Sequence, residues 1–137
     1  MNIWIIYPNG DIPGEGLRMG RSQMIAEALV PAGHEVTWWV STFNHNTKTF
    51  RSKEDIVVSP KFTIRPVQTN GYKRNISFQR IQSENEYSKQ IYLNAHKYKS
   101  PDIIIMSDPA LFRSKPIIKL VKEKKALLVL DVIDLWP

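Results

Sequence analysis

Three groups of residues in this chain could carry chemistry, and each follows an apolar stretch. The first is the glycine-rich segment that contains Gly14 and Gly16. The second is Ser107-Asp108-Pro109, and the third is the carboxylate pair Asp131 and Asp134. Glycines let backbone amides approach a phosphate, while carboxylates can hold sugar hydroxyls or assist proton transfer. Shared chemistry requires a fold that brings the three groups together.

Each group also has a purely structural interpretation. Two glycines in a loop often only form a turn, and this segment lacks the third glycine of a dinucleotide site. No Asp or Glu follows Trp38-Trp39-Val40 directly, where such a site would place its ribose-binding acid, so NAD binding loses support. Ser107, Asp108 and Asp134 would equally suit the starts of helices. The residues alone therefore leave binding, catalysis and capping open.

Apolar blocks alternate with helical patterns along the chain and predict a parallel sheet of five strands. The expected strands are residues 2–7, 35–40, 61–67, 102–106 and 126–132, and the expected long helices are residues 76–99 and 115–125. Before them, Met24, Ile25, Ala28, Leu29 and Ala32 recur at helical spacing, and Gly33 would end that first helix. The composition of residues 41–60 indicates a solvated loop, and the apolar run 126–130 indicates a buried last strand.

Right-handed β-α-β connections give these strands the expected order 3-2-1-4-5. Loops after the first, fourth and fifth strands then leave the sheet at the same carboxyl edge, where open α/β sheets bind ligands. We therefore expect Gly16, Asp108, Asp131 and Asp134 to converge there. The predicted fold class is α/β, a Rossmann-like parallel sheet with helices on both faces.

Composition and charge limit the class of protein. The 137 residues suit one domain, and the absence of cysteine excludes disulfides and thiolate metal sites. No apolar run has the length of a membrane span or the form of a signal peptide, so any membrane contact would be peripheral. The formal charge is +6, with 17 basic against 9 acidic residues after position 40. This basic part either attracts anionic lipids, diphosphates or nucleic acid, or is simply a solvated face.

The histidines offer no catalytic or metal-binding pattern. No two of His34, His45 and His96 have metal-ligand spacing, and no nucleophile elbow accompanies them. We expect each to be hydrogen-bonded or solvated.

Several motifs are spread over nearly the whole chain. They are Tyr7-Pro8, Gly14-x-Gly16-x-Arg18, Ala28-Leu-x-x-x-Gly33-His-Glu-Val-Thr-Trp-Trp39, Ser41-x-Phe43-x-His45 and Asp131-Val-x-Asp134-Leu-Trp-Pro137. Together they resemble the amino-terminal domain of glycosyltransferase family 4, and most closely the bacterial enzymes of surface-polysaccharide assembly.

This resemblance implies the GT-B architecture, in which two Rossmann-like domains face each other across a cleft. The first domain mainly holds the acceptor, and the second mainly holds the nucleotide-sugar. Members retain the anomeric configuration and typically need no metal. By analogy, Gly14 and Gly16 would approach the donor diphosphate, and Ser107-Asp108-Pro109 would replace the His-Glu-Pro-like turn of many relatives. Ile133 stands where the family pattern has arginine.

From this resemblance we expect residues 1–137 to be the acceptor-side domain of a retaining hexosyltransferase, truncated before its donor domain and inactive alone. The expected catalytic residues are Asp108 and Asp134, and the expected substrate-binding residues are Gly14, Gly16, Arg18, Ser107 and Asp131, with no metal and no cofactor. The expected partners are a nucleotide-sugar, a glycan or lipid-linked acceptor and an anionic membrane, but not nucleic acid. The expected location is the cytoplasm, extending to the inner face of the plasma membrane.

Two other functions remain open from the sequence. One is a non-catalytic Rossmann-like module that binds a small ligand or a partner. The other is half of a sugar-nucleotide epimerase with the same two-domain plan, which would need no acceptor.

Overall fold

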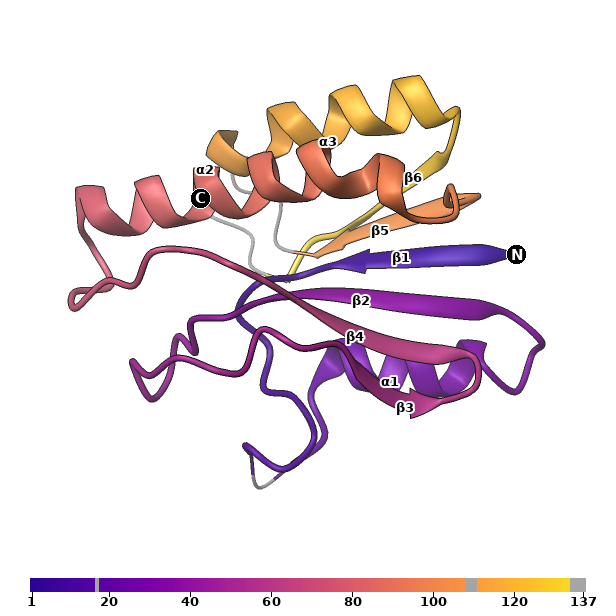
Figure 1. The fold of residues 1–137 in the computed structure, drawn as a ribbon, viewed down its shortest axis with the longest axis horizontal. Coiled ribbons are helices and arrows are strands. Elements are labelled where there is room, and N and C mark those ends of the chain that lie inside the picture. The colour runs from indigo at the N-terminus through magenta and orange to yellow at the C-terminus, as the bar shows by residue number, and fades with distance from the viewer. Residues whose placement is uncertain (17, 108–110, 134–137) are drawn as a thin grey trace.

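A six-stranded, mostly parallel sheet forms the centre of the computed structural model, which describes residues 1–16, 18–107 and 111–133 (Figure 1). The strands are β1 (Asn2–Ile6), β2 (Glu35–Ser41), β3 (Ile56–Ser59), β4 (Phe62–Val67), β5 (Ile103–Ser107) and β6 (Leu127–Asp131). The helices are α1 (Arg21–Leu29), α2 (Phe78–Asn94), the short 3-10 helix η1 (Ala95–Lys97) and α3 (Leu111–Lys124).

The strand order is β3-β4-β2-β1-β5-β6. Every neighbouring pair is parallel except β3 and β4. The five predicted strands are therefore confirmed in their predicted order, and the fold is Rossmann-like α/β. The parallel strands share one carboxyl edge, which is the edge that positions the candidate site.

The prediction that residues 41–60 form only a solvated loop is wrong, because this stretch contains β3. Ile56 pairs with Ile64, and Val57 pairs with Thr63, in an antiparallel ladder on the edge of β4. The run Ile56-Val-Val-Ser59 is rich in β-branched residues, and Pro60 and Lys61 turn the chain back into β4. The surrounding charged residues masked this short strand in the sequence.

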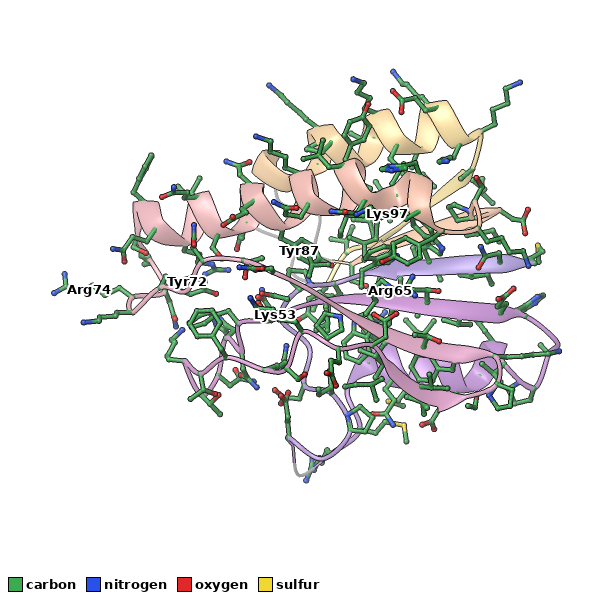
Figure 2. The ribbon with its side chains drawn as sticks, in the orientation of Figure 1. Lys53, Arg65, Tyr72, Arg74, Tyr87 and Lys97 are labelled. Carbon is green, nitrogen blue, oxygen red and sulfur yellow. The ribbon has the colours of Figure 1, made fainter. Side chains whose placement is uncertain are left out.

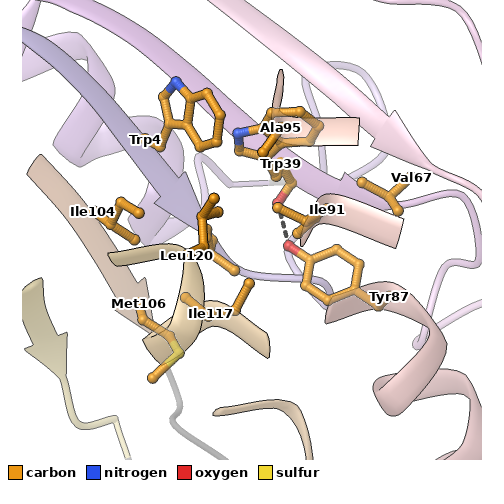
Figure 3. Packing of buried hydrophobic residues seen from close by; sticks show 11 residues of the cluster. Trp4, Trp39, Val67, Tyr87, Ile91, Ala95, Ile104, Met106, Ile117 and Leu120 are labelled. Carbon is orange, nitrogen blue, oxygen red and sulfur yellow. Dashed lines mark hydrogen bonds between the residues drawn. The ribbon is translucent and has the colours of Figure 1, made fainter. Parts of the chain in front are cut away.

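Helices cover both faces of the sheet, with α1 on one face and α2 and α3 on the other (Figure 1). The adjacent residues Trp38 and Trp39 of β2 point to opposite faces, and both are buried. Trp39 packs beside Trp4, and its carbonyl oxygen accepts a 2.7 Å hydrogen bond from the hydroxyl of Tyr87 in α2 (Figure 3). One hydrophobic core therefore lies on each face of the sheet, and together they make a rigid support for the loops at its carboxyl edge.

The last predicted strand is present as β6, but the prediction that it is buried is wrong. Leu127 is 62% exposed and Leu130 is 52% exposed, while Leu128 packs against the core under α2 and α3. As an edge strand, β6 has a single neighbour in the described chain, β5. An apolar sequence therefore indicated a strand correctly without revealing how much of it is covered.

The helix boundaries differ from those predicted. Helix α1 ends at Leu29, three residues before the expected end, and Gly33 lies in the following turn with a φ of 92°. Met24, Ala28 and Ala32 are exposed rather than inward, because Ser22 and Ala26 supply the buried positions of α1. Among the described residues, none of the helices combines the length and hydropathy that crossing a membrane requires.

The two later helices also begin at different residues from those predicted. Helix α2 begins at Phe78, after Ser77 caps it by accepting a hydrogen bond from the Arg80 amide. Helix α3 begins at Leu111, before the predicted start, and contains Pro116 in its first turns. The periodicity of residues 115–125 predicts that both Ile117 and Ile118 face inward; Ile117 is buried in α3, whereas Ile118 is 39% exposed.

Candidate functional site at the carboxyl edge of the sheet

Ser107 and Asp131 lie side by side at the carboxyl ends of β5 and β6. Asp131 is one of the residues predicted to converge at this edge, whereas Ser107 was predicted only to bind substrate. The Ser107 hydroxyl donates a 3.1 Å hydrogen bond to the Asp131 carboxylate. Arg21, at the start of α1, donates two more, from Nε at 2.8 Å and from Nη2 at 2.7 Å. The sequence analysis missed Arg21, because nothing in the chain's order links it to a strand 110 residues later.

These contacts fix the charge state of Asp131. The hydrogen bond from Arg21 lowers the pKa of the Asp131 carboxyl below its usual value, and this outweighs the opposing effect of partial burial. The Asp131 side chain is only 12% exposed, and both of its oxygens already accept hydrogen bonds. Such a carboxylate is suited to orienting a neighbour or holding a hydroxyl, and is poorly suited to accepting a proton near neutral pH.

The two predicted catalytic carboxylates, Asp108 and Asp134, lie outside the described residues. Their roles therefore remain predictions.

The glycine-rich loop after β1 contains the other predicted binding residues. Gly14 has a φ of 92°, which strongly favours glycine. A Cβ at Gly16 would lie 3.1 Å from Oδ2 of Asp11, so this position also has a packing reason to be glycine. Arg18 is exposed, and its side chain makes no hydrogen bond to the residues that the structure describes. The loop joins the Ser107–Asp131 cluster through Arg21.

Arg51, from the loop after β2, holds the glycine-rich loop in place. Its guanidinium pairs with the Glu15 carboxylate at 2.6 Å and also donates to the carbonyl oxygens of Ser41 and Gly10, each at 2.8 Å. The Arg51 side chain is only 4% exposed. Burial acts to raise the pKa of Glu15, but hydrogen bonds from Arg51 and the Ile12 amide outweigh it, so the pKa is lowered. Nothing in the sequence indicated this brace, because a single arginine in a polar loop resembles a solvated residue.

A small hollow with a volume of about 10 Å³, room for about one water molecule, lies beside these loops, between the ends of β1 and β2 and the first turns of α2. Its polar lining groups are partly buried and come from elements that are far apart in sequence. The lining residues are Pro8, Asn9, Ser41, Phe43, Tyr72, Ser83, Glu84 and Tyr87. Figure 2 shows Tyr72 and Tyr87 near the start and the middle of α2, facing this edge of the sheet.

Glu84 is the charged group of the hollow, and sequence reasoning missed it. Its carboxylate accepts a 2.9 Å hydrogen bond from Nε of Arg80, one turn earlier on α2. The Glu84 side chain is 10% exposed, and it shares the inward face of α2 with Tyr87, Ser88 and Ile91. The sequence did contain one indication of this site, an acidic residue on the inward face of a helix. A carboxylate buried there must be paired or hydrogen-bonded, and it often has a functional role. Paired charges of this kind can hold sugar hydroxyls in a defined orientation.

His45 contacts Tyr72, one of the residues that line the hollow. Its Nδ1 lies 2.6 Å from the hydroxyl oxygen of Tyr72, so the ring is hydrogen-bonded, as one of the sequence expectations had it. Burial lowers the pKa of His45, and the positive charges of Lys48 and Arg80 lower it further. The ring is therefore neutral near pH 7. Among the described residues, no three His, Asp or Glu side chains gather in a way that could hold a metal ion.

Comparison with known proteins supports the fold alone. No protein-family model matches the sequence, and a comparison with curated proteins finds no relative. Among solved structures, the chain is similar to the C-terminal domain of a hydrogenase from Pyrococcus furiosus, with a TM-score of 0.59 and 17% identity. This match covers 95% of the present chain and 89% of the other.

Proposed function

We propose that this chain is the acceptor-side domain of a retaining glycosyltransferase, whose parent enzyme transfers a sugar from a nucleotide-sugar to a glycan or lipid-linked acceptor. The observation that carries the proposal is the polar cluster at the carboxyl edge, where Ser107 and Arg21 both donate hydrogen bonds to the carboxylate of Asp131. Hydroxyl, carboxylate and guanidinium groups held together in this way can bind sugar hydroxyls. The motif resemblance to family 4 enzymes adds independent support.

The proposed division of labour follows the GT-B plan. The carboxyl edge around Asp131 would hold the acceptor, while Gly14 and Gly16 would face the donor diphosphate held by a second domain. Asp131, already ionised and oriented by Arg21, would hold a hydroxyl rather than transfer a proton. We place the parent enzyme in the cytoplasm, at the inner face of the plasma membrane, where lipid-linked acceptors are available.

Two assays test the proposal. Because half of the cleft would be missing, calorimetry of the 137-residue chain against UDP-, GDP- and dTDP-sugars should show no tight binding. A sub-micromolar dissociation constant would overturn the two-domain account. The second assay uses the complete product of the encoding gene and follows labelled sugar from each nucleotide-sugar into lipid and glycan fractions.

Variants connect that transfer to the carboxyl edge. Asp131→Asn should lower transfer at least about tenfold, because it removes the charge that holds an acceptor hydroxyl. The matched control Lys122→Gln, on the exposed face of α3, should leave transfer unchanged. Nucleotide-sugar interconversion without any acceptor would replace the proposal with the epimerase. Absence of any reaction together with tight binding of a small ligand would indicate the non-catalytic module.

A further inference from the structure

The turn that leads into α2 exposes large apolar side chains at the carboxyl edge of the sheet. Ile76 is 96% exposed and Phe78 is 79% exposed, while Phe50 from the loop after β2 is 63% exposed. Lys73 and Arg74 precede them and are exposed as well. We call Phe50, Lys73, Arg74, Ile76 and Phe78 the edge patch. Apolar residues this exposed, grouped at one end of a protein, mark an interaction surface.

The edge patch is one surface, although it comes from two loops. The ring of Phe43 contacts those of Phe50 and Tyr72, with centroids 5.3 Å and 4.8 Å away. Lys48 joins the loops a second time, because its Nζ donates a 2.6 Å hydrogen bond to the side-chain oxygen of Asn75. The patch therefore rests on a packed base, and its exposed side chains are held outward.

Two open grooves flank the turn that carries Lys73 to Phe78. One has a volume of about 480 Å³ and is lined by Ile76, Phe78 and Ile81 together with Arg80 and Glu84. The other has a volume of about 460 Å³ and lies between Phe50, Lys73 and Gln79. The first groove shares Glu84 with the small hollow beside Tyr72 and Tyr87.

The exposed turn before α2 carries unpaired positive charge. Residues 41–53 and 68–83 contain six Lys and Arg, of which Arg51 pairs with Glu15 and Arg80 pairs with Glu84. Within the described part of the chain, the side chains of Lys73 and Arg74 have no ion-pair partner. Figure 2 shows Arg74 projecting outward past the start of α2. The patch therefore presents exposed apolar side chains framed by free positive charge.

We propose that the edge patch docks on an anionic lipid bilayer. Ile76 and Phe78 insert at the level of the headgroups, and Lys73 and Arg74 contact the lipid phosphates. Apolar side chains flanked by Lys and Arg bind the interface through buried area plus attraction to anionic lipid. Lysine is depleted in the cores of protein interfaces, whereas Phe and Arg are common there, so a protein partner is the alternative that the vesicle assay tests.

The lysines of α3 make a useful contrast. Lys115, Lys119, Lys122 and Lys125 are also exposed, but on α3 itself the apolar side chain of Ile118 is only 39% exposed. Leu127, two residues after Lys125, is 62% exposed, which is less than the 96% of Ile76 and the 79% of Phe78. Docking through the edge patch also turns the carboxyl edge of the sheet toward the bilayer surface. The inference rests on the membrane location in the proposed function but not on the transfer reaction.

Vesicle sedimentation of the 137-residue chain tests the inference. The wild type should bind vesicles of mixed phosphatidylglycerol and phosphatidylcholine in a salt-sensitive way, and bind phosphatidylcholine alone much more weakly. Lys73→Gln/Arg74→Gln should weaken binding about tenfold or more, as should Ile76→Ser/Phe78→Ser, which leaves the charge unchanged. The charge-matched control Lys115→Gln/Lys122→Gln should weaken it less than about threefold.

A fluorescent probe locates the contact directly. The chain contains no cysteine, so Ile76→Cys and Lys122→Cys each give one labelling site for an environment-sensitive dye. The dye at position 76 should shift to the blue on anionic vesicles, whereas the dye at position 122 should not. Because both positions are exposed, circular dichroism of each variant should match the wild type.

The outcomes separate the inference from the proposed function. Wild-type binding that survives the edge-patch substitutions but is lost with the α3 control overturns the edge patch and keeps the membrane location. No wild-type binding to either vesicle removes both the patch and the location. Sugar transfer is measured separately, so its failure overturns the proposed enzyme without affecting the vesicle result.

Discussion

The guanidinium of Arg21 donates two hydrogen bonds to the carboxylate of Asp131 and so joins the first residue of α1 to the last residue of β6. In the sheet, β5 lies between β6, which carries Asp131, and β1, which leads through its loop to Arg21. The pair fixes the relative positions of the loop after β1 and the edge strand at the carboxyl side. It also gives Asp131 an orientation that a solvated carboxylate would lack.

This pair predicts a stability effect at low pH. Since Arg21 lowers the pKa of Asp131 in the folded state, the unfolded chain binds the proton more tightly. The contribution of Asp131 to stability is therefore complete above about pH 4 and is lost as pH falls through the lowered pKa. In Asp131→Asn, the thermal midpoint should fall less between about pH 5 and about pH 3 than in the wild type. Arg21→Gln should have the same effect, and a variant that keeps the full wild-type pH dependence would disprove the assignment.

A second prediction concerns the brace made by Arg51. Arg51→Met leaves the Glu15 carboxylate and the carbonyl oxygens of Ser41 and Gly10 without their buried donor. We expect a loss of about 2–3 kcal/mol in the free energy of unfolding, measured by urea denaturation. Lys99→Met is the matched control, because the Lys99–Glu35 pair is exposed on both sides. A loss in the control as large as that in Arg51→Met would mean that burial of the pair does not matter.

The brace and the edge cluster also show how far the sequence could predict this site. Apolar runs predicted the order of five strands, because burial and strand alternation are local properties that chain order turns into topology. That order was enough to place Ser107 beside Asp131. Arg21 and Arg51 were not predictable, since each acts through contacts with loops far away in the chain.

The errors in the predicted fold have a common physical origin. Residues 126–130 are as apolar as a central strand, but β6 lies at the edge of the sheet, and coverage is a tertiary property. Glu84 was not predicted, because carboxylates are usually solvated, whereas this one is only 10% exposed and pairs with Arg80, which is 32% exposed. Periodicity thus locates a helical face more reliably than it identifies the polar groups on that face.

A third prediction uses the close approach of backbone to Trp38. A Cβ at Gly10 would lie 2.5 Å from Cζ2 of Trp38, whose ring is fully buried and cannot move aside. Gly10→Ala should therefore lower the free energy of unfolding by about 2–3 kcal/mol. Gly20→Ser is the control, because the nearest atom to its Cβ is 3.5 Å away and serine is a favourable residue before α1. Thermal denaturation of both variants makes the comparison, and a tolerated Gly10→Ala would contradict the packing around Trp38.

The last prediction concerns His45, which links the hollow to the edge patch. Burial, Lys48 and Arg80 lower the pKa of His45, while Glu84 opposes them. The unfolded chain, with a histidine pKa of about 6.5, therefore binds the proton more tightly than the folded state does. The contribution of neutral His45 to stability is present above that value and declines as pH falls through the lowered pKa.

Nuclear magnetic resonance titration of the His45 ring should give a pKa below 6.5 in the wild type. Glu84→Gln should lower the pKa of His45 further, because it removes the negative charge that opposes the shift. Lys48→Met should raise it, because it removes a nearby positive charge. In urea denaturation, the stability lost between about pH 7 and about pH 5 should shrink in His45→Gln. A wild-type His45 that titrates at or above its ordinary value would show that the ring is solvated and that its contact with Tyr72 does not persist in solution.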